Sequence, residues 1–261
     1  LLMKEKKDRK RHFVSGECIH IYQKSVKGFI LFYETEDILA CYTMISVYSR
    51  IHQIKILEIC FMVDHFHILL IAENPEAMAG FMRDFSSAYV LSLNASTGRS
   101  GQLLHKSYGN APKKGDKKTR STIIYIGNNP VEKKLCTRAE GYRWNFLPYI
   151  LTPFPYSGKR TLRDMENSIR KLCKEVQDCR NRNEYLTHDR LHRMFSGLSD
   201  HDKEFLTDFI VMRYWCMDES AMISYFKDLK SMIEAMASTT GSEHDICETF
   251  IPEPDTSYHE M

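Results

Sequence analysis

Two histidines separated by one residue, His65 and His67, are the first candidates for chemistry in this chain. Apart from His67, residues 66–72 are apolar and rich in strand-forming types, which predicts a β-strand there. Because side chains alternate along a strand, both imidazoles should share one face while Phe66 points into the core. Two imidazoles on one face can share a metal ion, although strand histidines are also often purely structural. The spacing alone leaves both interpretations open.

Tyr125 and Asn129 form a second candidate pair, on a predicted helix that follows a basic segment. Residues four apart share a helix face, so the phenol and the amide can address the same point in space. Pro130 disfavours helical geometry at Asn129, so we expect the helix to end there. A buried tyrosine beside an asparagine that stops a helix is the alternative interpretation.

The elements that must position these residues follow from local patterns. Strands are predicted at residues 18–24, 54–63, 66–72 and 102–108, and a polar, basic loop at 110–118. Thr35 is the expected cap of one helix, and Asn74 with Pro75 starts a second whose apolar stripe should be core. The order strand, helix, strand, strand, helix, strand predicts an α+β fold, a ferredoxin-like antiparallel sheet with helices on one face.

The second half of the chain has a different character. Helices are predicted around residues 162–176, 205–210 and 220–237, and residues 191–215 can also form two helices with a turn at 197–200. We expect a catalytic domain at 1–150, a helical region at 151–237 and a flexible tail at 238–261. The acidic character of this half argues against an independent duplex reader.

Charge is divided unevenly along the chain. Residues 1–150 contain 22 Lys and Arg against 14 Asp and Glu, a net charge of +8, whereas residues 151–261 carry 14 against 20, a net charge of −6. A basic surface in the first half is typical of contact with phosphates, and a solvated charged face is the simpler alternative. The eight cysteines form no CxxC pair, which favours free thiols. No apolar run is long enough for a membrane span and no signal sequence is evident, so we expect a cytoplasmic protein.

An ordered series of motifs in residues 18–149 resembles the HUH single-tyrosine transposases, especially their REP-associated branch. The matching segments are HIYQK at 20–24, residues 32–37, CFMVDHFHILL at 60–70, GQLL at 101–104, YIGNNPV at 125–131 and YRW at 142–144. The sequence departs from the family in having Val63 and Asp64 where Pro-Asn is common, and Lys24 where arginine is frequent. Lysine keeps the charge but loses the bidentate geometry of a guanidinium.

The resemblance implies a divalent ion held by His65, His67 and Asn129, and attack by Tyr125 on single-stranded DNA beside a hairpin. The products would be a 5′-phosphotyrosine link and a free 3′-OH, in a monomer or a homodimer. Mg²⁺ or Mn²⁺ is expected, because no thiolate favours zinc and phosphate oxygens must join the coordination shell. The residues expected to contact DNA are Lys24, Lys106, Lys113, Lys114, Lys117, Lys118 and Arg120.

Other interpretations remain at this point. The chain can be a domesticated nucleic-acid-binding protein that no longer cuts, a relaxase or replication initiator with the same chemistry, or a metal-dependent hydrolase. The intact tyrosine, histidines and asparagine argue against the first, the short chain against a large relaxase, and the lack of an evident base against the third. Asp64 can support a metal ligand or face solvent. His20 can approach the metal from a neighbouring strand or be structural, and Tyr108 can stack on a base or belong to the sheet.

Overall fold

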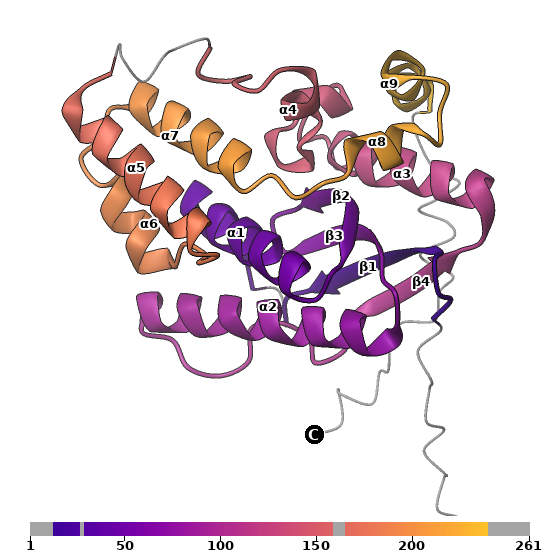
Figure 1. Cartoon of the computed structure of the whole chain (residues 1–261), viewed down its shortest axis with the longest axis horizontal. Coiled ribbons are helices and arrows are strands. Elements are labelled where there is room, and N and C mark those ends of the chain that lie inside the picture. Colours follow the sequence, from indigo (N-terminus) through magenta and orange to yellow (C-terminus); the bar gives the residue numbers. More distant parts are fainter. Residues whose placement is uncertain (1–12, 27–28, 159–164, 240–261) are drawn as a thin grey trace, which may run out of the picture.

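The computed structural model describes residues 13–26, 29–158 and 165–239. Its centre is a four-stranded antiparallel sheet in the order β2-β3-β1-β4 (Figure 1). The strands are β1 (Cys18–Lys24), β2 (Lys55–Phe61), β3 (His65–Ile71) and β4 (Gly109–Lys113). With α1 (Thr35–Ile51) and α2 (Pro75–Thr97) between them, the order and topology are ferredoxin-like, which confirms the predicted α+β fold class.

The sheet separates two apolar clusters because its strands alternate. On one face α1 and α2 pack on the sheet, and Ile19, Ile21 and Phe66 point toward them. On the other face lies α3 (Gly115–Glu132), with α8 (Glu219–Ile223) and α9 (Leu229–Ser238) beside it. The apolar contacts of this second face include Cys18, Cys60 and Leu69 of the sheet and Ile126 of α3. A helix is thus laid across the face to which the two histidines were predicted to point.

The two long helices on the first face begin where local chemistry favours a helix start. Asn74 caps α2 by accepting a hydrogen bond from the backbone of Ala77 at 2.8 Å, as predicted, and Gly98 ends the helix in the left-handed conformation with φ 66°. The N-cap of α1 is Glu34 and not Thr35, because the Asp37 carboxylate accepts the backbone N–H groups of Tyr33 and Glu34.

Two predicted boundaries around β4 are wrong. Residues 102–108 form no strand, although Leu104 makes an isolated bridge with Ser25, and the segment predicted as a basic loop contains β4 and the first turn of α3. Leu103 and Leu104 are apolar because they pack in the core, which local pattern cannot distinguish from a strand. β4 has weak strand propensity and forms by pairing with β1, where Pro112 is tolerated because its strand has one sheet neighbour.

The prediction that Pro130 ends the helix is also wrong, because α3 continues to Glu132. Pro130 lacks only its own N–H, and the turn around it is closed by the backbone N–H of Lys133, which bonds to the carbonyl of Asn129 at 3.1 Å. The helix then ends with Lys134 in the left-handed conformation and the N–H of Leu135 on the carbonyl of Pro130. Asn129 therefore projects from regular helix.

The C-terminal half is helical, as predicted, with η1 (Ala139–Gly141), η2 (Arg143–Asn145) and α4 (Leu147–Leu151) leading into it. The helices that follow are α5 (Asn167–Asn181), α6 (His188–Phe195) and α7 (Asp200–Arg213). The helix predicted at 220–237 is two helices, α8 and α9, since Asp218 and Asp228 each cap a separate start. The tail predicted to be flexible lies almost entirely outside the described residues, and the domain boundary at residue 150 stays a prediction.

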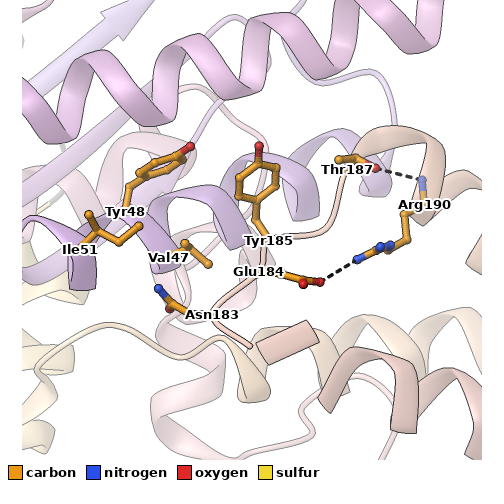
Figure 2. A pocket seen from close by; sticks show the side chains of 8 residues that line it. All are labelled: Val47, Tyr48, Ile51, Asn183, Glu184, Tyr185, Thr187 and Arg190. Carbon is orange, nitrogen blue, oxygen red and sulfur yellow. Dashed lines mark hydrogen bonds and ion pairs between the residues drawn. The ribbon is translucent and has the colours of Figure 1, made fainter. Parts of the chain in front are cut away.

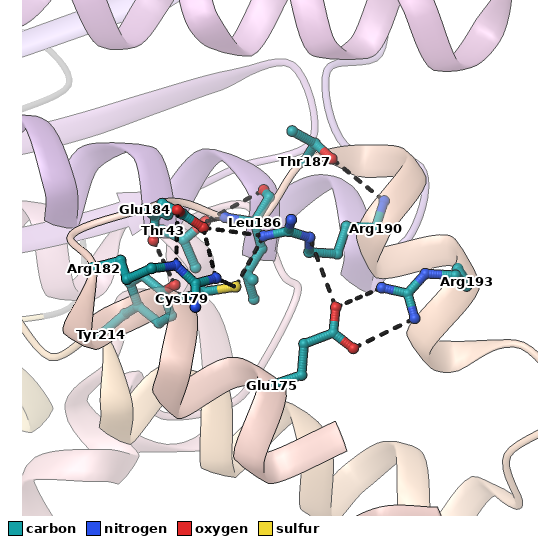
Figure 3. A network of polar contacts seen from close by, with 10 residues as sticks. All are labelled: Thr43, Glu175, Cys179, Arg182, Glu184, Leu186, Thr187, Arg190, Arg193 and Tyr214. Atoms are coloured by element: carbon teal, nitrogen blue, oxygen red, sulfur yellow. Dashed lines mark hydrogen bonds and ion pairs between the residues drawn. The ribbon is translucent and has the colours of Figure 1, made fainter. Parts of the chain in front are cut away.

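Polar contacts link α5, α6 and α7 to one another, to α1 and to the segment around α4. Thr43 of α1 accepts the backbone N–H of Leu186 at 3.1 Å, and Tyr214 donates to the carbonyl of Glu184 at 2.7 Å. Glu175 of α5 pairs with Arg190 and with the guanidinium of Arg193 on α6 (Figure 3). A buried aspartate, Asp208 of α7, accepts the Tyr149 hydroxyl at 2.8 Å and the backbone N–H of Ser157 at 2.9 Å. The core of the sheet domain is continuous with these helices.

Candidate active site

The antiparallel register brings polar side chains of β1 beside the two histidines of β3. Tyr22 pairs with His67 and Lys24 pairs with His65, so these four side chains project from the same face of the sheet. His20 follows the same alternation and belongs to this face. It is the face that α3 covers, and the pairing that produces it connects residues more than 40 positions apart in the sequence.

From the opposite side, α3 presents Tyr125 and Asn129 to the sheet. Both are buried, with 5 % and 3 % of their surface exposed. The amide nitrogen of Asn129 lies 3.2 Å from the phenol oxygen of Tyr125 and 3.4 Å from Nε2 of His67. The His67 and Tyr125 rings meet edge to face with centroids 5.7 Å apart. The structure therefore assembles the two candidate pairs into one cluster.

The buried imidazole of His67 is held by a second imidazole. Nε2 of His20 lies 2.9 Å from Nδ1 of His67, and the rings meet edge to edge, with centroids 5.1 Å apart and planes inclined by only 25°. Burial lowers the pKa of His20 to about 3, and burial likewise lowers the pKa of His67 well below its usual range. Both rings are neutral at physiological pH, which is the state that a metal ligand requires.

His65 lies at the more open end of the cluster and has a carboxylate partner. Its Nδ1 is 2.6 Å from Oδ1 of Asp64, and its ring meets that of His67 with centroids 5.0 Å apart. The hydrogen bond to His65 lowers the pKa of the Asp64 carboxyl. A carboxylate on Nδ1 fixes the ring and leaves Nε2 as the nitrogen that can bind a cation. Asp64 therefore supports a histidine of the cluster, which is one of the two roles that its position in the sequence allowed.

The donor set fits a divalent ion only if an amide takes part. Within residues 13–26, 29–158 and 165–239, no three His, Cys, Asp or Glu side chains are grouped so that they can hold a metal ion. The oxygen of Asn129, however, is buried and has no hydrogen-bond partner among the described residues. An unsatisfied buried carbonyl is costly, and a bound cation would satisfy it. Two neutral imidazoles and one amide oxygen suit Mg²⁺ or Mn²⁺ with further positions open.

The basic residues lie on both sides of this cluster. Lys24 is exposed at the end of β1, and the backbone N–H of His105 bonds to its carbonyl, which places Lys106 near the same end. Lys113 ends β4, and its charge contributes to the lowered pKa of His20. Four more exposed cations lie at the start of α3, with Lys114 at its N-cap and the others in its first two turns: Lys114, Lys117, Lys118 and Arg120. At 1.5 Å per residue, Lys118 precedes Tyr125 by about 10 Å along the helix.

Tyr22 is a site residue that sequence reasoning missed. Its ring lies 6.5 Å from that of His67 and 6.0 Å from that of His20, centroid to centroid, and the side chain is partly exposed. The ring occupies the space above Gly109 of β4, where a Cβ atom would stand 2.1 Å from it. The alternation of His20, Tyr22 and Lys24 in the first strand was the available signal. Tyr108, a candidate for stacking on a base, is buried outside any strand.

Other tyrosines have structural partners elsewhere. The Tyr89 hydroxyl donates to the carbonyl of Leu31 at 2.6 Å, and the Tyr142 hydroxyl donates to the carbonyl of Phe61 at 2.9 Å. Burial raises the pKa of both phenols above the usual value. Among the residues that the structure describes, neither hydroxyl has an asparagine partner such as the one at Tyr125.

A pocket of about 360 Å³ lies away from this cluster, between the C-terminal end of α1 and the segment that joins α5 to α6 (Figure 2). Tyr48 and Ile51 line one side, and Tyr185, Thr187 and Arg190 line the other. Arg190 is engaged with Glu184 and Glu175, and Tyr48 meets Tyr185 with ring centroids 5.9 Å apart. None of the candidate catalytic residues borders the pocket, so it is separate from the cluster around His67.

Among the described helices, none is both long and apolar enough to cross a membrane. Residues 29–129 match the family model described as transposase IS200 like, a segment that contains His65, His67, Tyr125 and Asn129. This match confirms the family resemblance of the sequence. A solved structure of a REP-associated tyrosine transposase bound to a REP hairpin is similar, with 14 % identity and a TM-score of 0.46 over 55 % of this chain and 84 % of that one. No curated protein matches the chain.

Proposed function

We propose that this chain, whose residues 29–129 place it with the IS200-like transposases, cuts and rejoins single-stranded DNA with Tyr125 as nucleophile and a divalent metal ion as cofactor. The family supports a DNA-processing protein. The observation that carries the finer proposal is the position of Asn129, whose amide nitrogen lies 3.2 Å from the phenol oxygen and 3.4 Å from Nε2 of His67. A candidate nucleophile and candidate metal ligands are thereby adjacent.

The chemistry must overcome two barriers, since a phenol with an ordinary pKa near 10 is a weak nucleophile and a phosphodiester repels anions. When bound by His65, His67 and Asn129, a divalent ion would neutralise the phosphate and orient it for in-line attack. The hydrogen bond from the Asn129 amide to the phenol oxygen stabilises negative charge on that oxygen. Burial of Tyr125 keeps competing water away from the covalent intermediate.

The bonds exchanged are defined by this assignment. The phenol oxygen of Tyr125 bonds to phosphorus, the bond from phosphorus to O3′ breaks, and the released 3′ oxygen takes up a proton. The phenol loses one proton and the 3′ oxygen gains one, so the step neither consumes nor releases protons overall. The phosphotyrosine keeps the phosphoryl group activated, and a second 3′-OH can displace the phenol and rejoin a strand without ATP.

In this proposal, the basic residues on either side of the cluster bind the phosphates of the DNA strand and guide it to Tyr125. Lys24 and Lys106 flank His65, and Lys113, Lys114, Lys117 and Lys118 lead along β4 and α3 toward Tyr125. Neutralising phosphates releases counterions, so binding should weaken steeply with salt. A row of lysines can serve any nucleic acid, and the choice of unpaired DNA near a hairpin is part of the proposal.

The decisive experiment uses a pool of stem-loop oligonucleotides with single-stranded flanks, labelled at either the 5′ or the 3′ end. With Mg²⁺ or Mn²⁺, the 3′ label should migrate with the protein in a denaturing gel, and the 5′ label should remain on a free fragment with a 3′-OH. Chelation with EDTA should abolish both the protein–DNA adduct and the free fragment. A 5′ label on the protein would reverse the assigned polarity. Binding without any adduct in either metal would favour a domesticated, non-cleaving protein.

A further inference from the structure

His20 is a buried histidine to which neither the family match nor the proposed metal site assigns a role. It is 1 % exposed on the sheet face beneath α3, and its Nε2 lies 2.9 Å from Nδ1 of His67. The two rings are nearly coplanar, as an N–H···N hydrogen bond requires, and they belong to the neighbouring strands β1 and β3. His67 is the only imidazole of the described chain that contacts both His20 and Asn129.

The position of the proton in this pair follows from the third partner. An amide NH₂ group can only donate hydrogen bonds, and Nδ2 of Asn129 faces Nε2 of His67 at 3.4 Å. Nε2 must therefore be the acceptor, and a neutral His67 must carry its proton on Nδ1. The Nδ1–H of His67 then donates to Nε2 of His20, and His20 carries its own proton on Nδ1.

We infer that His20 is a positioning residue that accepts the proton of His67 Nδ1 and so keeps the Nε2 lone pair of His67 directed at Asn129. If the bridge ran the other way, from His20 to His67, then Nε2 of His67 would carry a hydrogen and could not bind a cation. The inference rests on the proposed function for its purpose, because the lone pair that faces Asn129 is the one that would bind the metal ion. The proton arrangement itself does not depend on that function.

The two histidines of the HxH motif are thus oriented by different means. Asp64, 54 % exposed at its side chain, bonds Nδ1 of the more open His65, whereas a neutral imidazole bonds Nδ1 of the buried His67. A carboxylate beside His67 would bring a charge into a site that is almost without solvent, which is costly unless the charge is paired. A second imidazole accepts the same hydrogen bond without that cost.

The first test is the proton position in the metal-free protein. Two-bond ¹H–¹⁵N spectra of histidine-labelled protein, with His67 assigned by its loss in His67→Gln, should show a protonated Nδ1 and a bare Nε2. In His20→Leu the acceptor is gone, and we expect the spectrum to shift toward the Nε2–H form. His20→Gln can present an amide oxygen near the former Nε2 position and should restore the Nδ1–H form in part. His188→Gln, at a buried histidine on α6, should leave His67 unchanged.

The second test is Mn²⁺ affinity, measured by electron paramagnetic resonance of the free ion. Loss of a partner that orients a metal-binding histidine typically weakens binding by about 10 to 100-fold, so His20→Leu should fall in this range and His20→Gln should bind more tightly than His20→Leu. The inference is overturned if wild-type His67 carries its proton on Nε2, or if His20→Leu changes neither spectrum nor affinity. If the proton position is as expected but wild type binds no Mn²⁺, the inferred bridge stands and the proposed metal chemistry fails.

Discussion

Tyr125 and Asn129 lie one turn apart on α3, with the amide nitrogen 3.2 Å from the phenol oxygen, and α3 carries both of them onto the histidine face of the sheet. The pair belongs to one helix, so its geometry is set locally. Its position over His67 is set by the packing of α3 against the sheet. Substitutions at each of the two residues can separate their contributions to binding and to chemistry.

Replacing Tyr125 with Phe should separate binding from chemistry. The change removes only the phenolic oxygen, so the ring keeps its packing between α3 and the sheet while nucleophilic attack is lost. We expect unchanged affinity for a stem-loop substrate and no adduct with the 3′-labelled strand. Tyr142→Phe is the matched control and should still form the adduct. An adduct formed by Tyr125→Phe would mean that another residue is the nucleophile.

Asn129→Leu should reduce both metal binding and adduct formation while the fold persists. Leucine has a similar volume and removes the orphaned amide oxygen, so the free energy of unfolding should change little or rise. Mn²⁺ affinity should fall by about 10-fold or more, as expected for a lost ligand or orienting group. Asn128→Leu is the neighbouring control, because Asn128 bonds the backbone of Met236 at 2.8 Å and should affect stability instead. Wild-type Mn²⁺ affinity in Asn129→Leu would remove Asn129 from the ligand set.

Reversing the charge of the lysines that precede Tyr125 should weaken DNA binding. In the variant with Lys113, Lys114, Lys117 and Lys118 changed to Glu, the slope of log K against log salt should flatten by about 0.7 for each lost phosphate contact on a single strand. Lys171→Glu with Lys174→Glu, on the exposed side of α5, is the charge control. Equal salt slopes in the two variants and wild type would mean that these four lysines do not contact DNA and form only a solvated surface.

The buried His188 should make the protein sensitive to acid. Burial lowers its pKa to about 4, while the same residue in the unfolded chain titrates near 6.5. Its contribution to stability is complete above the unfolded value and is lost as the pH falls from about 6.5 toward 4, at about 1.4 kcal/mol per pH unit. His188→Gln should lower the slope of unfolding free energy against pH in this window, and exposed His201→Gln should not. Parallel slopes for wild type and His188→Gln would contradict the assignment.

The buried Glu58 should make the stability of the protein depend on pH in the opposite sense to His188. Its carboxyl is 1 % exposed beneath Gly127 of α3, neither oxygen has a hydrogen-bond partner among the described residues, and burial raises its pKa well above the usual value. Its contribution to stability is complete below the unfolded pKa near 4.3 and is lost as the pH rises toward the folded value.

Glu58→Gln removes this ionisation and should raise the urea midpoint above that of wild type at pH 7.5, by more than at pH 4.5. Exposed Glu73→Gln is the control and should have the same effect at both values. An advantage of Glu58→Gln that does not grow with pH would indicate that the carboxyl is ionised in the folded protein.

Local sequence determined much of the frame. The strand at Cys18–Lys24 and the start of the helix at Pro75 were predicted as they are found, because alternation and a capping asparagine act within a few residues. The spacing of His65 and His67 likewise placed both imidazoles on one face, and spacing of four placed Tyr125 beside Asn129. Each of these relationships is fixed by the geometry of a single strand or helix.

Tertiary structure decided what these local pairs meet. β4 exists because β1 offers a strand to pair with, although local propensity predicted a loop there. Likewise α3 continues past Pro130 because only one backbone donor is missing, although the proline predicted a helix end. The contacts of His67 with His20, 47 residues away, and with Asn129, 62 residues away, depend on strand pairing and on the helix laid across the sheet. The sequence by itself specified which groups share a face, and only the packing of α3 on that face brought them within bonding distance, since such distances depend on elements that no local pattern encodes.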